Sequence, residues 1–176
     1  SIAIGQESKT AAGQSFATAL GYKSNASGWA SFAQGSSALA SGDKSISIGA
    51  SSKATVDRGI AIGDEASTDN QSASNTSTTK TQTDNKQSVA IGPWAQAWGD
   101  QSTAIGNNVK SSGNSSVAIG GDDIDKVRTA HGNLYQNITG QALPGGYPAT
   151  ESAGGASVAV GVGATSQGQF STAIGM

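Results

Sequence analysis

Few residues of this sequence could do chemistry. The chain contains one histidine, His131, and no cysteine, so neither a histidine cluster nor a thiolate site nor a disulfide can form. Asp122, Asp123 and Asp125 follow a Gly-Gly pair and could supply carboxylate ligands to calcium, but calcium-binding nonapeptide motifs occur in tandem and this one occurs once. We interpret this segment as a solvated turn that changes the direction of the chain. We therefore expect no catalytic residues, no metal and no cofactor, and we expect that the protein is not an enzyme.

A second unusual group is a pair of tryptophans that flank a glutamine. Trp94, Gln96 and Trp98 alternate with alanines, so a strand would place all three on one face. The chain has three tryptophans in all, and tryptophan is enriched at binding hot spots. Two interpretations are open: the three residues form a candidate ligand-contact surface, or they pack against an inserted loop of this chain or of a neighbouring one.

The scaffold that must position these residues is poor in large apolar side chains. Hydrophobic residues make up 35% of the 176 residues and aromatic residues 5%, and 25 residues are glycine. The net charge is -2 and the basic residues are scattered, whereas nucleic-acid binding needs a basic stripe. The sequence shows no signal peptide and no apolar run near the roughly 20 residues of a membrane span. We expect contact with neither nucleic acid nor membrane. Because the chain begins and ends inside a repeat, we interpret it as a fragment whose anchor lies outside it.

A glycine recurs after a short apolar segment along the whole chain. Six of the nine successive spacings are fourteen residues, and spacings of 29 and 41 mark insertions at about 71–87 and 121–155. A second glycine stands seven residues after most of these, and two glycines per repeat predict two tight turns that need positive φ. The first set of turn glycines is Gly5, Gly21, Gly35, Gly49, Gly63, Gly92, Gly106, Gly120, Gly161 and Gly175.

Small and large residues alternate before each turn glycine. The second residue before it is alanine, with Ser47 as the exception, and the first and third residues before it are mostly isoleucine or valine. This period-two alternation predicts a strand. A second strand after the glycine has small residues such as Ala38 and Ala40 at its third and fifth positions and mostly polar residues between them. Each repeat is then one coil of two strands, and residues 1–176 form a single all-β array of parallel, stacked coils.

Two arrangements of the coil are open. Either the alanines and serines of both strands face each other and the aliphatic side chains point outward, or the aliphatic side chains point inward. We favour the first, because small residues on facing sheets pack closely without voids. The aliphatic residues would then form a continuous exposed stripe, which usually marks an interface. We predict an obligate oligomer of parallel chains joined along Ile2, Ile4, Ile46, Ile48, Ile60, Ile62, Val89, Ile91, Ile105, Val117, Ile119, Val158, Val160 and Ile174.

The two insertions differ in character. Residues 71–87 are nearly all polar and predict an exposed loop, although a threonine ladder is the alternative. Residues 121–155 include Leu134, Tyr135 and Ile138 and are too apolar for a free loop. We predict that this segment folds back onto the rod of its own chain or over an adjacent subunit.

Several repeats resemble a known family. Ser88-Val89-Ala90-Ile91-Gly92, Ser102-Thr103-Ala104-Ile105-Gly106 and Ser116-Val117-Ala118-Ile119-Gly120 resemble the head repeats of trimeric autotransporter adhesins, the YadA-like heads. The resemblance covers nearly all of the chain outside the insertions, and the segment that begins at Gly121 is similar to the family's head-insert motifs. It implies a left-handed parallel β-roll, a homotrimer, and display on the outer membrane of a Gram-negative bacterium. It also implies virulence-related adhesion to host cells or to matrix proteins such as collagen, fibronectin or laminin.

The function expected from this resemblance has competitors. A passive spacer or fibre segment, with the ligand site elsewhere, has the same repeats. Solenoid acyltransferases use a six-residue period and solenoid lyases cluster acids and bases on one face, and neither pattern occurs here. An ice-binding solenoid needs regular threonine ranks, and Thr18, Thr103 and Thr172 are too sparse. We therefore expect an adhesin head.

Overall fold

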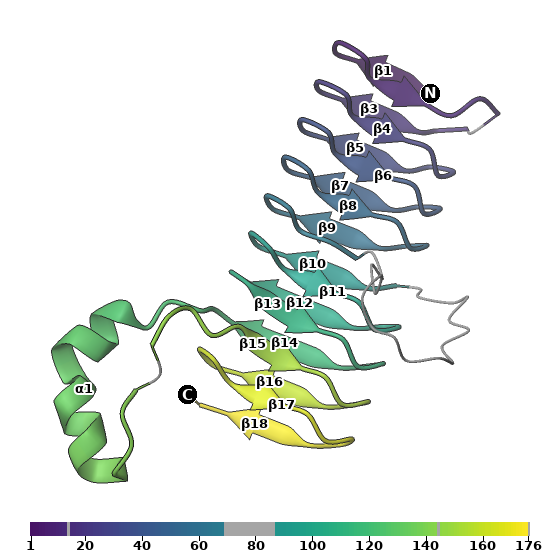
Figure 1. Ribbon diagram of the computed structural model, residues 1–176. Coiled ribbons are helices and arrows are strands. Elements are labelled where there is room, and N and C mark those ends of the chain that lie inside the picture. The colour runs from purple at the N-terminus through teal and green to yellow at the C-terminus, as the bar shows by residue number, and fades with distance from the viewer. Residues whose placement is uncertain (14, 69–86, 144, 176) are drawn as a thin grey trace, which may run out of the picture.

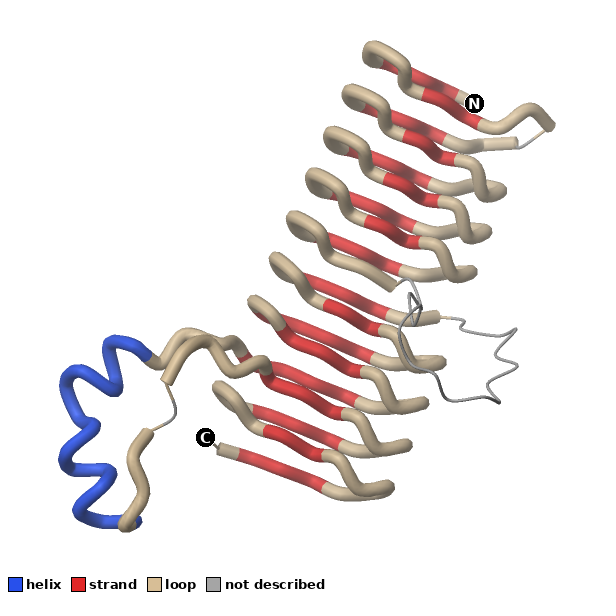
Figure 2. Tube along the Cα trace, viewed as in Figure 1, coloured by secondary structure: helices blue, strands red, loops and turns tan. Residues whose placement is uncertain are grey.

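The computed structural model describes residues 1–13, 15–68, 87–143 and 145–175, and it shows a rod of stacked coils from whose side one helix projects (Figure 1). Eight of the ten coils have two short strands joined by turns (Figure 2). The first strands of the coils form one 10-stranded parallel sheet. In order along the rod they are β1 (Ile2–Ile4), β3 (Thr18–Leu20), β5 (Phe32–Gln34), β7 (Ile46–Ile48), β9 (Ile60–Ile62), β10 (Val89–Ile91), β12 (Thr103–Gly106), β14 (Val117–Gly120), β16 (Val158–Val160) and β18 (Thr172–Ile174).

The second strands of the coils form two 4-stranded parallel sheets on the opposite side of the rod. Ser67 forms single bridges to Lys53 and to Gln96, and so connects the two sheets. The strands of the first sheet are β2 (Lys9–Thr10), β4 (Asn25–Ala26), β6 (Leu39–Ala40) and β8 (Lys53–Ala54); those of the second are β11 (Gln96–Ala97), β13 (Val109–Ser111), β15 (Thr150–Ser152) and β17 (Thr165–Ser166).

The register of the strands follows the repeat. Ala90 stands opposite Ala61 across the first insertion, and Ala159 stands opposite Ala118 across the second. Equivalent residues therefore lie directly above one another, and the predicted parallel solenoid of fourteen-residue coils is confirmed.

Small side chains fill the interior of the rod. Ala61 and Ala104 of the 10-stranded sheet and Ala38 and Ala95 of the opposite side are all 0% exposed. The aliphatic residues of the same strands point away from this interior, and Ile4, for example, is 61% exposed. The first of the two arrangements is thus the observed one. The 10-stranded sheet can lie close to the two 4-stranded sheets because the alanine and serine side chains between them are small.

The first set of turn glycines has the backbone conformation that the sequence predicts. Every member except Gly120, where the second insertion starts, has a φ between 112° and 132°. An added Cβ on Gly49 would also overlap the carbonyl oxygen of Gly63 in the next coil. These positions need glycine both for the positive φ and for the close stacking of the turns.

The prediction for the second set of glycines is wrong. Gly28 and Gly42 do not have a positive φ, although an added Cβ on either would overlap a carbonyl oxygen of the next coil. Positive φ occurs instead two residues later, at non-glycine residues such as Ala30 (φ 52°) and Lys44 (φ 58°). Close stacking, and not backbone conformation, therefore selects glycine at the second turn.

Buried serines connect the two sides of the roll by hydrogen bonds. The Ser111 and Ser116 hydroxyl oxygens lie 2.6 Å apart, and the Ser116 hydroxyl donates to the Gly113 carbonyl oxygen, also at 2.6 Å. Ser102 occupies the equivalent position one coil earlier, but its buried hydroxyl has no partner within the described part of the chain. When a hydroxyl is buried without a hydrogen-bond partner, nothing offsets the free-energy cost of removing it from water.

Substitution of these two serines by alanine is expected to change the free energy of unfolding in different ways. We expect Ser116→Ala to lower the free energy of unfolding by about 1 kcal/mol, because it removes two hydrogen bonds from a buried network. Ser102→Ala is expected to be neutral or stabilising, because it removes an unsatisfied group. Denaturant unfolding at one protein concentration compares the two variants, and equal losses in both would contradict the assignment.

The structure corrects the limits of both insertions. Gln87 belongs to a second turn of the roll, because its N–H donates to the Asp57 carbonyl oxygen as that of Arg58 does to Asp43. The rest of the predicted loop at 71–87 lies outside the described residues. The second insertion ends at residue 149 rather than 155, because Thr150–Ser152 forms β15 and pairs in register with β13.

The second insertion also contains a helix, α1 (Asp125–Thr139), whereas the rest of the described chain is the predicted parallel β-solenoid. Gly140 ends α1 in the left-handed conformation, with its N–H bonded to the Gln136 carbonyl. The prediction that the segment folds back onto its own rod is wrong for α1, which among the described elements lies against none of the strands. Leu134 and Ile138 are 58% and 75% exposed. A helix satisfies its backbone groups internally, so it can leave the rod without a sheet partner.

Candidate binding surface

Trp94, Gln96 and Trp98 lie on the outer side of the rod: Trp94 in the turn before β11, Gln96 in β11 and Trp98 directly after it. Ala95 and Ala97, which alternate with them, are 0% exposed inside the roll. Trp94 has a φ of 52° and is 47% exposed, whereas Gln96 and Trp98 are half-buried. The three side chains point out of the roll, and their role as a ligand-contact surface stays a prediction.

Charged residues of the adjacent coils hold the two indoles in place. The Trp94 Nε1–H donates to the Glu65 carboxylate at 3.0 Å. The Lys110 ammonium lies 5.2 Å from the centre of the Trp98 ring and 3.4 Å from a carboxylate oxygen of Glu151. Such contacts between a cation and an aromatic ring are favourable. We call Trp94, Gln96 and Trp98, together with Glu65, Lys110 and Glu151, the tryptophan patch.

The spacing in the sequence indicates where two of the charged residues of the patch lie. Glu65 stands two residues after its turn glycine, as Trp94 does, and Lys110 stands four residues after its own, as Gln96 does. Column-by-column comparison would have placed them beside the tryptophans. Glu151 had no such signal, because the second insertion separates it from its turn glycine and only the pairing of β13 with β15 brings it to Lys110.

The predicted interface residues form a second surface, on the outer side of the 10-stranded sheet. All fourteen point out of the roll and none is buried in the single chain. Ile2, Ile4 and Ile174, in the first and last coils, are 54%, 61% and 78% exposed, whereas Ile48 and Ile62 between stacked coils are half-buried. We call these fourteen residues the aliphatic stripe.

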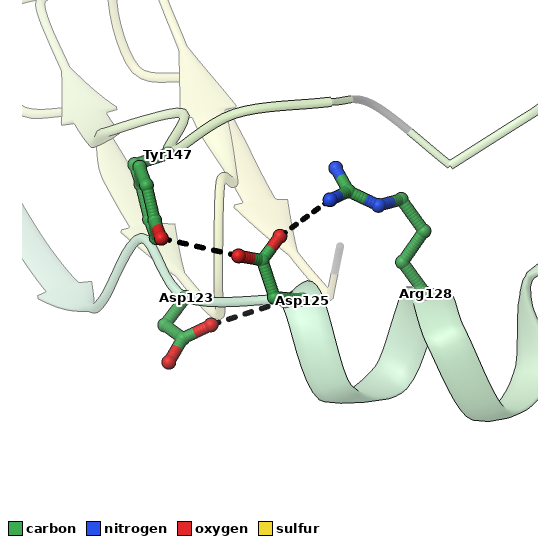
Figure 3. A network of polar contacts seen from close by, with 4 residues as sticks. All are labelled: Asp123, Asp125, Arg128 and Tyr147. Carbon is green, nitrogen blue, oxygen red and sulfur yellow. Dashed lines mark hydrogen bonds and ion pairs between the residues drawn. The ribbon is translucent and has the colours of Figure 1, made fainter.

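The carboxylates that the sequence suggested as calcium ligands hold the base of the second insertion. Figure 3 shows that the Asp125 carboxylate accepts hydrogen bonds from Arg128 at 2.6 Å and from the Tyr147 hydroxyl at 3.1 Å. Asp123 accepts from the Asp125 backbone N–H at 3.0 Å. The two ends of the insertion are thereby linked to each other.

Asp122 corrects the interpretation of this segment as a solvated turn. It is 7% exposed, and its two carboxylate oxygens accept hydrogen bonds from the side-chain amides of Asn107 and Asn108 at 2.7 Å and 3.0 Å. A buried carboxylate needs such partners. Asp122 therefore ties the insertion to the preceding coil, whereas His131 is exposed on α1.

The Asp125 contact changes the titration of Tyr147. The carboxylate accepts a hydrogen bond from the neutral phenol and repels the phenolate, and both effects raise the pKa of Tyr147 above 10.0. Because the pKa is raised in the folded state, this contact is intact below pH 10 and is lost as the pH rises through the raised pKa.

We expect Asp125→Asn to return the pKa of Tyr147 toward its ordinary value. Ultraviolet absorbance of tyrosinate during a pH titration measures this, and a Tyr147→Phe variant isolates the contribution of Tyr147 from those of Tyr22 and Tyr135. Identical titrations before and after Asp125→Asn would contradict the contact.

The fold and the two surfaces define a class of protein. It is a parallel β-solenoid repeat protein with a small-residue interior, an aliphatic outer face on one sheet and a mainly polar outer face on the other. None of the described helices is both long enough and apolar enough to span a bilayer.

Comparison with known families identifies the solenoid. The model of the YadA head domain repeat matches residues 30–51, 40–66, 84–108 and 152–176. The chain belongs to the YadA-like head domains, as the resemblance of its repeats predicted. No curated protein matches the chain.

Proposed function

We propose that this chain is the non-catalytic head of a trimeric adhesin, which attaches a Gram-negative bacterium to host cells or to matrix proteins of the collagen, fibronectin and laminin class. The observation that carries the proposal is the aliphatic stripe on a chain of the YadA-like head family. The anchor in the outer membrane would lie outside this chain, and the head itself would make no membrane contact.

The stripe supports assembly from parallel copies. Its residues lie on eight of the ten strands on one side of the rod, all except β3 and β5, so copies placed side by side in parallel can bury them along most of their length. Burial of apolar surface contributes about 25 cal/mol per Å², and a shared seam adds this term at each coil. The proposals that three copies assemble and that the coil is left-handed rest on what is typical of the family.

Assembly through the stripe leaves the opposite side of the rod free for contact with a host. That side carries polar residues in every coil, and three parallel copies would present it three times. Weak contacts made by several copies add through avidity, so attachment of a cell needs no single tight site.

Binding of the assembled head to immobilised matrix proteins tests the proposal. We expect a purified trimer to bind at least one of collagen, fibronectin and laminin and to compete with attachment of cells that display the protein. A trimer of confirmed mass that binds none of them, and does not compete, would support the alternative of a passive spacer.

A further inference from the structure

The tryptophan patch presents two indoles on the outer side of the rod, of which Trp94 is 47% exposed and Trp98 is half-buried beside Lys110. Trp94 and Trp98 are four residues apart and stand on either side of β11, Trp94 in the turn before it and Trp98 directly after it. Stacked coils support the backbone from both sides, through hydrogen bonds such as those from the Trp94 N–H to Asp64 and from the Trp98 N–H to Ser111. The contacts of the indoles with Glu65 and Lys110 fix the rings before any ligand arrives.

The surroundings of the two indoles are polar. In the same outer columns of the sheet lie Lys53, Ser67 and Ser112, in addition to the charged members of the patch. A protein-binding hot spot usually sits in a well-packed apolar centre that excludes water. Two separate indoles with hydroxyl, amide and carboxylate groups between and beside them do not form such a centre.

We propose that the tryptophan patch binds an uncharged oligosaccharide. The C–H face of a sugar ring is apolar and packs on an indole, whereas its hydroxyls both donate and accept hydrogen bonds. The Glu65 and Glu151 carboxylates accept such bonds, and the Gln96 amide can donate as well as accept. Two indoles on either side of β11 offer two packing surfaces, which suits a chain of more than one sugar.

The charge of the patch selects against acidic glycans. Glu65 and Glu151 bring two negative charges; Asp64 lies next to Glu65 in the turn of the preceding coil, and Asp100 lies in the turn that follows Trp98. Lys110 is already paired with Glu151. A sulfated or sialylated chain would meet more negative than positive charge, and like charges brought together at an interface are unfavourable. This inference deepens the proposed function, because it rests on the head being an adhesin that presents this side to a host.

A glycan array that holds neutral, sulfated and sialylated oligosaccharides tests the inference with the assembled protein. We expect binding to neutral oligosaccharides, a loss of about tenfold for Trp94→Ser or Trp98→Ser, and a larger loss for the double variant. Trp94→Phe and Trp98→Phe keep an aromatic face and are expected to retain part of the binding. Circular dichroism and the mass of the trimer show whether each variant is folded and assembled.

Trp29 supplies the matched control. It is 39% exposed and the Lys44 ammonium lies 5.1 Å from its ring, so it resembles Trp98 in chemistry but lies outside the patch. We expect Trp29→Ser to bind the neutral glycans as the unchanged protein does. A loss as large as that of the patch variants would overturn the assignment to the patch.

Other outcomes separate this inference from the proposed function. Binding only to acidic glycans, or unchanged binding by a folded double variant, would overturn the glycan assignment. A trimer that binds deglycosylated matrix protein through the patch but no glycan would show that the partner is a protein, and the adhesin function would stand. A trimer that binds neither matrix protein nor glycan would contradict both.

Discussion

Replacing Ile62 by aspartate is expected to abolish the oligomer. Ile62 lies in the middle of the aliphatic stripe, half-buried between Ile48 and Ile91 of the adjacent strands. In a parallel assembly each chain would place one carboxylate in the shared apolar seam, close to the identical carboxylates of its copies. Leaving a charge buried without a partner costs several kcal/mol, and the like charges repel one another. Light scattering should therefore show the assembled mass for the unchanged protein and monomers or unfolded chains for Ile62→Asp.

Leu39→Asp is the matched control for this experiment. Leu39 is also a half-buried aliphatic residue in a strand, β6, but it points outward on the opposite side of the rod. We expect Leu39→Asp to keep the assembled mass. Dissociation by both variants would show that acidic residues destabilise the roll in general. A folded monomer of the unchanged protein would contradict the stripe as an interface.

Gly49→Ala is expected to have the second large effect, this time on the roll itself. The residue has a φ of 129°, where an alanine is strained by about 1–3 kcal/mol. The added Cβ would also overlap the Gly63 carbonyl oxygen, and the turns cannot separate without breaking the hydrogen bonds of adjacent strands. We expect the free energy of unfolding to fall by about 3 kcal/mol or more.

Thermal and denaturant unfolding at a fixed protein concentration measure this loss, since assembly couples stability to concentration. Gly121→Ala is the control, because an added Cβ there meets nothing within 4 Å and the backbone does not have a positive φ. It should change stability by less than about 0.5 kcal/mol. Equal effects of the two substitutions would contradict the stacking of the turns as the reason for glycine.

Much of the fold could be predicted because the repeat is regular. Fourteen-residue spacing fixed the coil, and the alternation of Ala61 between Ile60 and Ile62 indicated a strand with one small and one large face. The inward direction of the small face followed from packing, because facing alanines fill a thin roll without voids. The outward direction of Trp94, Gln96 and Trp98 followed from the same alternation.

The remaining features depend on contacts between coils, which spacing along the chain does not encode. Gly42 needs glycine because the next turn lies against it, and not because of its φ. Glu151 reaches Lys110 only after an insertion returns the chain to the sheet. Asp122 is buried because two asparagines of the preceding coil meet it.

The sequence by itself determined the period, the two strands of each coil and the face on which each side chain lies, because these depend on local backbone geometry and residue size. Only the tertiary structure decided where the insertions end, that one of them forms a helix that leaves the rod, and which charges flank the tryptophans. The physical reason is that a local pattern fixes the direction of a side chain. Its neighbours are fixed by the stacking of segments that are distant in the sequence.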